Sequence, residues 1–221
     1  MMGNAIIFPS IEETLVALLS EISDGEIIIA LIYTLLRTLS ASTISFFIAL
    51  TMAFLAYRYK TVKEFIKPYL NVLKTIPTVA LIVIALLLIG REGSVMVAIF
   101  LLAFPLFYNG ILFALENIDD DLLRMTKTYD VSYIFKIKRI FLPLITDDII
   151  STAKSALSLA FKVAVMSELL VQVHIGLGHE LYFYRINILT PEVFALTLIM
   201  IVVSILFDKV LDILASRLSS L

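Results

Sequence analysis

The sequence contains no cysteine and no tryptophan, and it has only two histidines and seven glycines among 221 residues. Without cysteine there are no disulfides, thiolate metal ligands or cysteine nucleophiles. The few histidines and glycines leave little material for a metal centre or a phosphate-binding loop, and no Gly-x-x-x-x-Gly-Lys pattern is present. We therefore expect no catalytic site, no metal, no bound cofactor and no ATP hydrolysis by this chain itself.

Charge is also scarce. Charged residues make up 16% of the chain and hydrophobic residues 61%, whereas globular proteins average roughly 25% and 45–50%. The hydrophobic residues gather in blocks of membrane-spanning length, which excludes a soluble enzyme and argues against a nucleic-acid partner. The composition predicts an all-α integral membrane protein that forms one compact unit in a lipid bilayer.

Five segments are candidates for membrane spans. A spanning helix needs about 20 largely apolar residues. Four runs without any charge meet or approach this length: residues 38–57, 75–90, 93–115 and 193–207. Residues 142–171 are also long enough, although they contain Asp147, Asp148, Lys154, Lys162 and Glu168. We predict five spans, of which the fourth carries the polar residues.

The basic residues predict the orientation, because lysine and arginine are enriched in cytoplasmic loops. Twelve of them fall in the loops after spans one and three and in the C-terminal tail, and only Arg91 and Arg185 fall on the opposite side. The first 36 residues contain five acids and no lysine or arginine. We expect a multi-pass protein of the plasma (inner) membrane with its N-terminus outside and its C-terminus in the cytoplasm.

The N-terminal segment has a different pattern. Residues 11–22 mix acids with five apolar positions, Leu15, Val16, Leu18, Leu19 and Ile22. This pattern is typical of an amphipathic helix that lies on a membrane surface. We therefore divide the chain into an external amphipathic segment, residues 1–25, and a transmembrane domain, residues 26–221.

The cytoplasmic loop of residues 116–142 is too elaborate for a simple connector. Its pattern predicts two short helices, residues 122–128 and 132–141, separated near Asp130 and stopped by Pro143. One interpretation is a solvated basic helix held by anionic lipid. The other is a docking surface for a cytoplasmic partner.

The end of this loop resembles a known family. Ile140-Phe141-Leu142-Pro143 matches the end of the Glu-Ala-Ala, three residues, Gly, nine residues, Ile-x-Leu-Pro pattern of type I ABC importer permeases. Asp130 stands where that family has Gly, and Arg124-Met125-Thr126 stands where it has Glu-Ala-Ala. The chain thus resembles the transmembrane permease subunit of binding-protein-dependent ABC importers, in the branch for sulfonates, taurine, nitrate and thiamine precursors.

Further short motifs of that family follow in the same order along about 210 residues. They are Phe8-Pro9-Ser10, Thr34-Leu35-Leu36-Arg37, Lys74-Thr75-Ile76-Pro77, Ala103-Phe104-Pro105, Ser167-Glu168-Leu169-Leu170 and Gly176-Leu177-Gly178. Family members usually have an extra span before the Pro-Ser motif, and this chain starts at that motif. The resemblance therefore implies a five-span, MetI-like core rather than six spans.

The resemblance also implies partners and functional positions. The partners would be two copies of an ABC ATP-binding subunit, an external solute-binding protein and a second copy of this chain. The coupling residues for the ATPase would be Arg124, Thr126, Lys127, Tyr129, Asp130, Val131, Ser132, Ile140, Leu142 and Pro143. Gly176, Leu177 and Gly178 would form an external gate, and Phe161, Lys162, Ser167 and Glu168 would lie on or beside the translocation path.

Charges inside the predicted fourth span have more than one interpretation, since an intramembrane charge faces the bundle interior or water. Lys154 and Lys162 either pair with acids such as Asp147 or Asp148, or snorkel, or Lys162 lines a path for an anionic solute. Glu168 is expected to brace the gate. A stand-alone secondary transporter or channel subunit that uses Lys162, Glu168 and Asp147 is the alternative function, followed by a membrane scaffold without transport.

Overall fold

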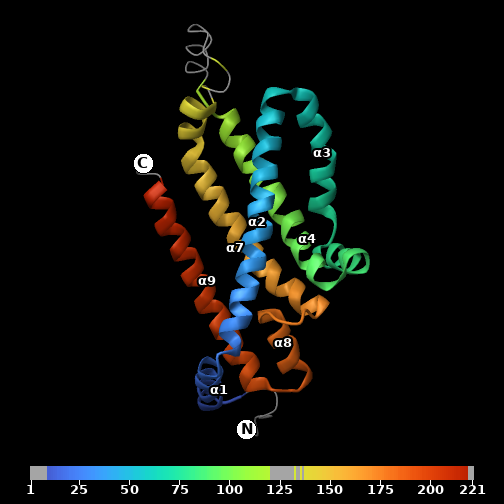
Figure 1. The fold of residues 1–221 in the computed structure, drawn as a ribbon, viewed down its shortest axis with the longest axis vertical. Coiled ribbons are helices and arrows are strands. Elements are labelled where there is room, and N and C mark those ends of the chain that lie inside the picture. Colours follow the sequence, from blue (N-terminus) through green and yellow to red (C-terminus); the bar gives the residue numbers. More distant parts are fainter. Residues whose placement is uncertain (1–8, 120–131, 133–134, 136, 219–221) are drawn as a thin grey trace. The chain divides into compact units, whose positions relative to one another are not determined.

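The computed structural model describes residues 9–119, 132, 135 and 137–218, and all regular structure in this part is helical (Figure 1). The α-helices are α1 (Ile11–Asp24), α2 (Glu26–Arg58), α3 (Lys60–Thr75), α4 (Thr78–Glu116), α7 (Leu142–Val171), α8 (Leu177–Ile186) and α9 (Thr190–Leu218), and a π-helical turn, η1, covers Ile137–Phe141. This confirms the predicted all-α fold.

Helix α1 begins and ends at residues with clear capping chemistry. The Ser10 hydroxyl accepts from the Glu13 backbone N–H at 3.1 Å, and the Ser10 N–H donates to the Glu13 carboxylate at 2.7 Å, which forms a capping box. Gly25 then ends the helix with a φ of 74°. The apolar side chains Ile11 and Val16 are 80% and 68% exposed. The predicted helix is thus present, and its location on the outer surface of the membrane stays a prediction.

In the part of the chain that the structure describes, four helical segments are long and apolar enough to cross a membrane: Glu26–Arg58, Thr78–Glu116, Arg139–Val171 and Thr190–Ile213. The count of five spans is not confirmed, because the predicted second and third spans both fall within α4. This helix is interrupted at Gly90, whose φ of 75° and ψ of −176° are not helical. Its 39 residues would extend about 58 Å as one straight helix.

The start of α7 differs from its predicted form. A break was expected at Pro143, but η1 leads directly into α7 at Leu142. Proline is tolerated in the first turn of a helix, where its missing N–H would have no partner, so Pro143 does not end the helical path. Most of the predicted coupling loop, including the helix of residues 122–128, lies outside the described residues.

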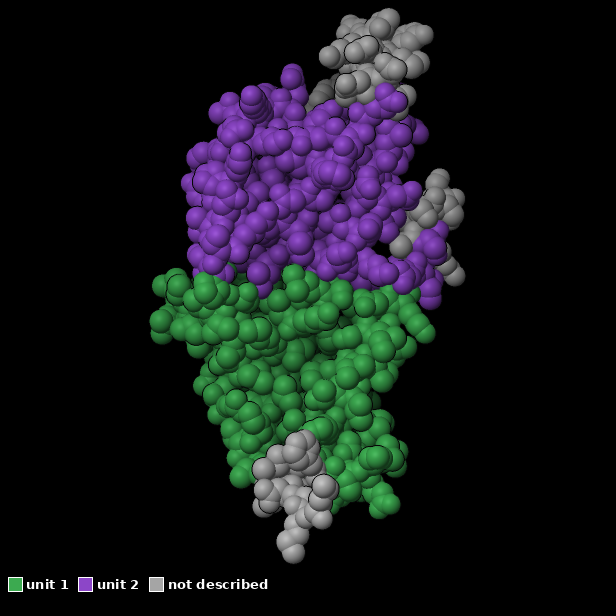
Figure 2. Space-filling view, turned by 180° about the vertical axis from the view of Figure 1, so that it is seen from behind, with its two compact units in different colours: residues 1–41, 77–99, 158–209 green, residues 42–76, 100–157, 210–221 purple. Residues whose placement is uncertain are grey.

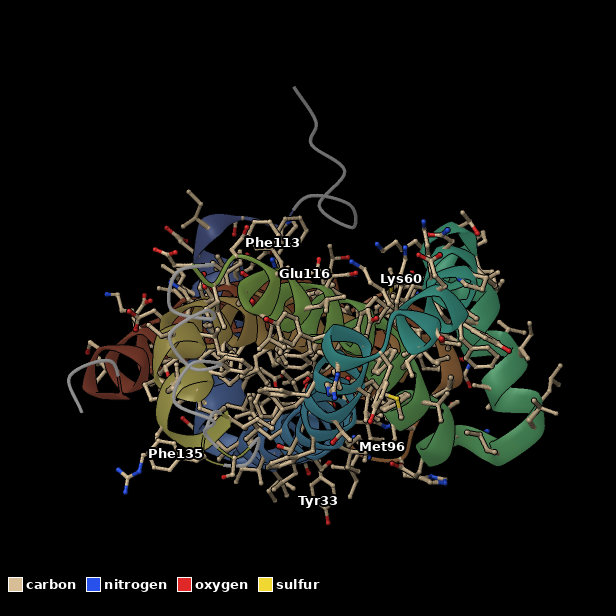
Figure 3. The ribbon with its side chains drawn as sticks, turned by 90° about the horizontal axis from the view of Figure 1, so that it is seen from above. Tyr33, Lys60, Met96, Phe113, Glu116 and Phe135 are labelled. Atoms are coloured by element: carbon tan, nitrogen blue, oxygen red, sulfur yellow. The ribbon has the colours of Figure 1, made fainter. Side chains whose placement is uncertain are left out.

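The chain divides into two compact units, coloured separately in Figure 2. Unit 1 consists of residues 1–41, 77–99 and 158–209, and unit 2 of residues 42–76, 100–157 and 210–221. Each unit has its own buried cluster. Many large apolar side chains remain at the surface, such as Tyr33 in unit 1 and Phe113 in unit 2, which are 43% and 68% exposed (Figure 3). Such surfaces are typical of helices that face lipid.

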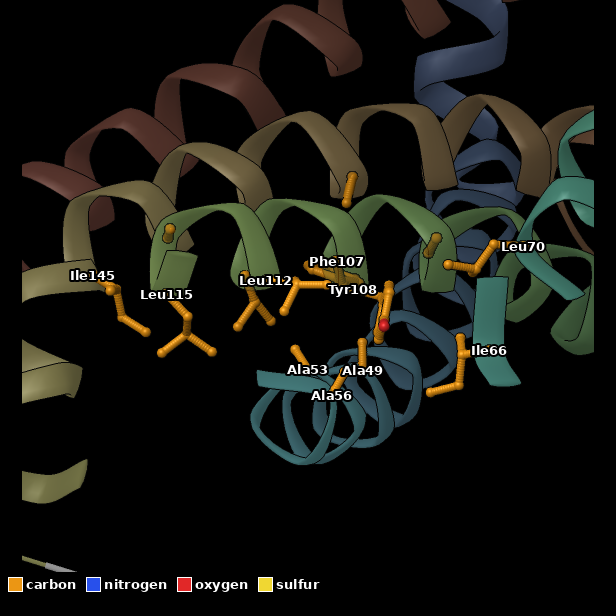
Figure 4. Packing of buried hydrophobic residues seen from close by; sticks show 14 of the residues in the cluster. Ala49, Ala53, Ala56, Ile66, Leu70, Phe107, Tyr108, Leu112, Leu115 and Ile145 are labelled. Atoms are coloured by element: carbon orange, nitrogen blue, oxygen red, sulfur yellow. The ribbon is translucent and has the colours of Figure 1, made fainter. Parts of the chain in front are cut away.

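The core of unit 2 joins α2, α3, α4 and the start of α7 (Figure 4). Ala49, Ala53 and Ala56 follow one face of α2, and their small side chains allow close approach to the neighbouring helix. Phe107 and Ile111 of α4 fill the space and are 2% and 0% exposed. The core of unit 1 is smaller and contains Ile27, Ala30, Phe161, Leu177, Tyr184 and Leu196.

Candidate functional site

A fully buried carboxylate lies near the end of α7. Glu168 is 0% exposed, and burying an unpaired charge would be very unfavourable. Its Oε1 accepts from Arg37 Nη1 of α2 at 2.8 Å. Its Oε2 accepts from the Thr34 hydroxyl of α2 at 2.9 Å and from the Gly178 N–H of α8 at 3.1 Å. The Glu168 side chain therefore connects three helices of unit 1 at one point.

Arg37 extends this network to a second acid and to the backbone. Its Nε and Nη2 donate to the two carboxylate oxygens of Glu92 at 2.8 and 3.0 Å. Its Nη1 also donates to the carbonyl of Ile175 at 2.7 Å. The forked guanidinium thus binds Glu92 in a bidentate way and still reaches Glu168, a geometry that lysine cannot reproduce. We call Arg37, Glu92, Glu168, Thr34 and Gly178 the Glu168 cluster.

The two glycines beside Leu177 permit this close approach. Gly176 has a φ of 155°, and a Cβ there would lie 2.6 Å from Glu168 Oε2. At Gly178 a Cβ would lie 2.4 Å from the carbonyl oxygen of Val165. Neither distance allows a side chain, so the segment before α8 packs directly against α7 because it has glycine at both positions.

Shortly after the end of α7, and again after the end of α8, a residue other than glycine adopts the left-handed conformation. Gln172 has a φ of 53°, and the next N–H, from Val173, donates to the Glu168 carbonyl. Ile188 has a φ of 57°, and the Leu189 N–H donates to the Tyr184 carbonyl at 2.9 Å. These bonds form Schellman-type caps, which usually have glycine at the left-handed position. Left-handed Gln172 and Ile188 therefore store strain around α8.

Helix α8 is also connected to α1. The Tyr184 hydroxyl donates to Glu21 Oε2 at 2.7 Å. Burial, followed by this bond and the charge of Glu21, raises the pKa of Tyr184 well above its usual value. Burial also raises the pKa of Glu180, an effect that His179 opposes and that Glu26 and Glu21 reinforce. Acidic groups thus crowd around α8, and Tyr184 stays a neutral donor to one of them.

Part of the Glu168 cluster is accessible from a cleft of about 440 Å³ in unit 1. The cleft is lined by Tyr33, Leu36, Arg37, Ser40, Glu92, His174 and Ile175. Glu92 faces the opening with a side chain that is 55% exposed, whereas Glu168 lies behind Arg37 with none. The cluster offers no nucleophile placed beside a base, so its chemistry is that of a polar clamp between helices.

Comparison with known protein families identifies the chain. Residues 41–220 match the family of binding-protein-dependent transport system inner membrane components. The chain belongs to this family. It is therefore an ABC transporter permease, the subunit class that forms the membrane pathway in binding-protein-dependent transport. The match includes Glu92, Glu168 and Gly178 of the Glu168 cluster, whereas Thr34 and Arg37 of α2 precede it.

Curated relatives agree with this assignment over nearly the whole permease. A probable ABC transporter permease protein of Brucella melitensis biotype 1 is 20% identical over 98% of this chain and 88% of its own length. A probable ABC transporter permease protein of Brucella abortus strain 2308 is also 20% identical, over 98% of this chain and 86% of its own length.

Solved structures show the same fold. An inward-facing form of the MetNI methionine ABC transporter aligns with a TM-score of 0.75 and 16% identity, covering 89% of the permease and 98% of that chain. An amino acid ABC transporter crystallised with histidines aligns with a TM-score of 0.74 and 16% identity, covering 90% and 98%. The permease thus has a MetI-like fold.

The structure separates the residues predicted for the translocation path. Phe161 is buried in the unit 1 core and contacts the Phe207 ring. Ser167 is buried and donates to carbonyl groups one turn back in its own helix. Lys162 is exposed and lines a cleft of about 440 Å³ with residues of α9, and it forms no ion pair with the residues that the structure describes. Glu168 accepts a hydrogen bond from Gly178 of the predicted gate, and Phe161 lies in the same core cluster as the gate residue Leu177.

The remaining predicted positions lie elsewhere. Lys154 pairs with Asp212 of α9 rather than with Asp147 or Asp148. Ser132 and Pro143 are exposed, and Ile140 and Leu142 are half-buried. The other coupling residues, Arg124, Thr126, Lys127, Tyr129, Asp130 and Val131, lie outside the described residues.

Sequence reasoning missed Thr34 and Arg37 as partners of Glu168, and Glu92 as the second partner of Arg37. Thr34 and Arg37 are part of a family motif, but the motif gave no pairing. A usable signal was present, since an arginine next to an uncharged run of 20 residues must find a partner if it is buried. The identity of that partner depends on which helices are neighbours, and spacing along the chain does not provide this.

Proposed function

We propose that the permease forms the translocation pathway for a small solute and that the Glu168 cluster braces its outer gate. The observation that carries this proposal is the buried Glu168 carboxylate, which binds α2 and the first turn of α8 simultaneously. A short helix held at one end by a few polar bonds can detach as a unit when those bonds break. The Gly176-Leu177-Gly178 segment is then the hinge of the gate.

The energy for transport would come from ATP hydrolysis by a separate ATPase subunit. In this proposal residues 122–141 dock into an ABC ATP-binding subunit, with Arg124, Thr126, Lys127, Tyr129, Asp130, Val131, Ser132, Ile140, Leu142 and Pro143 at or beside the contact. The docking end precedes α7, and Glu168 lies near the other end of the same helix. A difference in affinity of the loop for two ATPase states would bias the gate between its closed and open arrangements.

The full assembly would contain two copies of this permease, two ATP-binding subunits and an external solute-binding protein. We also retain five spans with the N-terminus outside. In this topology residues 75–90 form the second span, and α3 lies in the cytoplasmic loop before it. An odd number of spans agrees with the predicted opposite locations of the two termini.

The solute would be small, and an anion is favoured. Lys162 supports this proposal, because its exposed ammonium group borders a cleft between α7 and α9 and has no counter-ion among the residues that the structure describes. A sulfonate, a nitrate-like anion or a thiamine precursor fits the branch that the sequence resembles. In this proposal Phe161, Lys162 and Ser167 follow the path on α7.

The ATPase coupling can be tested by co-purification. The permease is expressed with its ATP-binding subunit, and residues 122–141 are replaced by a Gly/Ser linker of equal length. We expect the ATPase to be retained by the natural sequence and lost after the replacement. An unchanged amount of ATPase after the replacement, or uptake driven by a proton gradient without any ATPase, would contradict the proposal.

The path can be tested in proteoliposomes that contain the permease and its ATPase, with the binding protein added outside. Lys162→Leu should abolish uptake of an anionic solute while binding-protein docking persists, because only the local charge in the cleft is removed. Lys209→Leu serves as the control, since Lys209 is a lysine of α9 that lies outside this cleft. Normal uptake by Lys162→Leu at normal expression would refute the role of Lys162.

A further inference from the structure

Helix α3 carries a polar stripe that the proposed gate and coupling loop do not use. Lys63, Lys67, Asn71 and Lys74 recur at intervals of four, four and three residues, which places them on one face of the helix. This stripe borders a cleft of about 260 Å³ in unit 2. The cleft is lined by Lys63, Glu64, Lys67, Leu70, Asn71, Lys74, Tyr108, Asn109 and Leu112.

The two other faces of α3 are apolar. Ile66 and Leu70 are buried in the unit 2 core, 9% and 5% exposed. Phe65 and Tyr69 are 65% and 59% exposed and contact each other with ring centroids 5.3 Å apart. The lysine stripe is therefore the only polar face of α3, and it is directed to the cleft with α4 rather than to the exposed apolar side.

The cleft has an excess of positive charge. Lys63 pairs with Glu116, the last residue of α4, and Glu64 adds one carboxylate to the lining. Lys67 and Lys74 form no ion pair with any residue that the structure describes. Two ammonium groups on one side of a cleft repel each other unless an anion lies between them.

A buried hydroxyl provides an independent sign of a missing acceptor. Tyr108 is 2% exposed, and its ring lies in the core beside Ala49 and Leu70 (Figure 4). Tyr108 is one of the residues that line the cleft, and its buried hydroxyl has no hydrogen-bond partner among the described residues. A buried donor without a partner costs about 1–3 kcal/mol. The neighbouring Asn109 does not relieve it: its side-chain N–H donates to the Pro105 carbonyl at 2.5 Å, and its side chain forms no described hydrogen bond with Tyr108.

We propose that this cleft binds an oxyanion group, a phosphate or a sulfonate, with Lys67, Lys74 and Tyr108 as its donors. Such a group accepts several hydrogen bonds at once and neutralises the two ammonium groups. The cleft volume corresponds to about nine water molecules, which accommodates one tetrahedral oxyanion and its substituent. The group belongs either to the headgroup of an anionic phospholipid or to a small free anion. The inference does not depend on the proposed gate.

The test uses the full chain in nanodiscs of phosphatidylcholine. One arm adds phosphatidylglycerol and counts bound lipids by native mass spectrometry. The other adds inorganic phosphate or methanesulfonate and follows binding by calorimetry. The double variant Lys67→Gln/Lys74→Gln should weaken binding at least tenfold in whichever of the two experiments detects binding. Tyr108→Phe should weaken the same binding severalfold. Lys60→Gln, an exposed lysine of the same helix outside the cleft (Figure 3), should bind like the natural protein.

The two arms name the source of the oxyanion. Binding of phosphatidylglycerol alone identifies a lipid headgroup, and binding of phosphate or methanesulfonate alone identifies a free anion. The proposal is overturned if neither binds, or if the double variant binds as tightly as Lys60→Gln. Melting temperatures of all variants are compared first, and Tyr108→Phe keeps the packed ring, so a loss of binding by this variant is not a loss of fold.

Discussion

The Nη1 atom of Arg37 lies 2.8 Å from Oε1 of Glu168 and donates in addition to the Ile175 carbonyl at 2.7 Å. One nitrogen thus joins the buried carboxylate of α7 to the segment that leads into α8. Because Glu168 also accepts from Thr34 and Gly178, its charge is compensated entirely by groups of other segments. Removing any one of these groups changes both the stability of unit 1 and the attachment of α8.

The two acids that bind Arg37 should contribute very unequally to stability. Glu168→Gln leaves a buried arginine short of its charge partner and should lower the free energy of unfolding by about 3 kcal/mol. Glu92→Gln should cost at most about 1 kcal/mol, because the Glu92 side chain is 55% exposed and water replaces the lost interaction. Thermal unfolding of both variants in the same detergent is the measurement. Equal shifts in melting temperature would contradict the assigned burial.

Gly178 should not tolerate any side chain. In Gly178→Ala the new Cβ would lie 2.4 Å from the Val165 carbonyl oxygen and 2.5 Å from Glu168 Cβ, so α8 must move away from α7. We expect a loss of about 2 kcal/mol in the free energy of unfolding and impaired transport. Gly93→Ala is the matched control, since its Cβ meets only the flexible Ile89 side chain at 3.3 Å, and a helical Gly-to-Ala change is mildly favourable. Similar unfolding curves for the two variants would argue against the close approach.

Glu180 should make stability depend on pH. Burial raises the pKa of Glu180 in the folded protein above the value of about 4.3 in an unfolded chain. The folded state therefore holds this proton more tightly. The associated stability is complete below the unfolded pKa and is lost as the pH rises through the folded pKa. Glu180→Gln removes this loss, so the variant should gain in melting temperature relative to the natural protein as the pH rises above the unfolded pKa of about 4.3. Parallel curves for the two proteins would refute the raised pKa.

Tyr184 should anchor α1 to the gate helix. Tyr184→Phe removes the 2.7 Å bond to Glu21, and a hydrogen bond to a charged acceptor contributes about 1.5–3 kcal/mol. We expect faster hydrogen exchange in residues 11–24 with little change in the unit 2 helices. Tyr182→Phe in the same helix is the control, because its ring still lies beside the Arg185 guanidinium, 5.5 Å away. Unchanged exchange in α1 after Tyr184→Phe would show that this bond does not hold the helix.

Much of the architecture could be predicted from the sequence because it follows from local composition. Apolar runs and acid placement indicated the long helices and α1. The least reliable predictions concerned boundaries between elements. Gly90 does break α4 between the predicted second and third spans, but Pro143 continues a helix that it was expected to start afresh.

The pairing of charges could not be predicted in the same way. Lys154 was expected either to pair with an acid, with Asp147 and Asp148 as examples, or to snorkel; it does pair with an acid, but this is Asp212, which is 58 positions away. Arg37 meets Glu168 across 131 positions. The sequence by itself determined that this chain is a helical membrane permease, because hydrophobic run length and motif order are properties of the linear chain. Only the tertiary structure decided which polar groups meet, because that depends on how the helices are rotated and how closely they approach each other. Here the close approach depends on two glycines, where any side chain would collide.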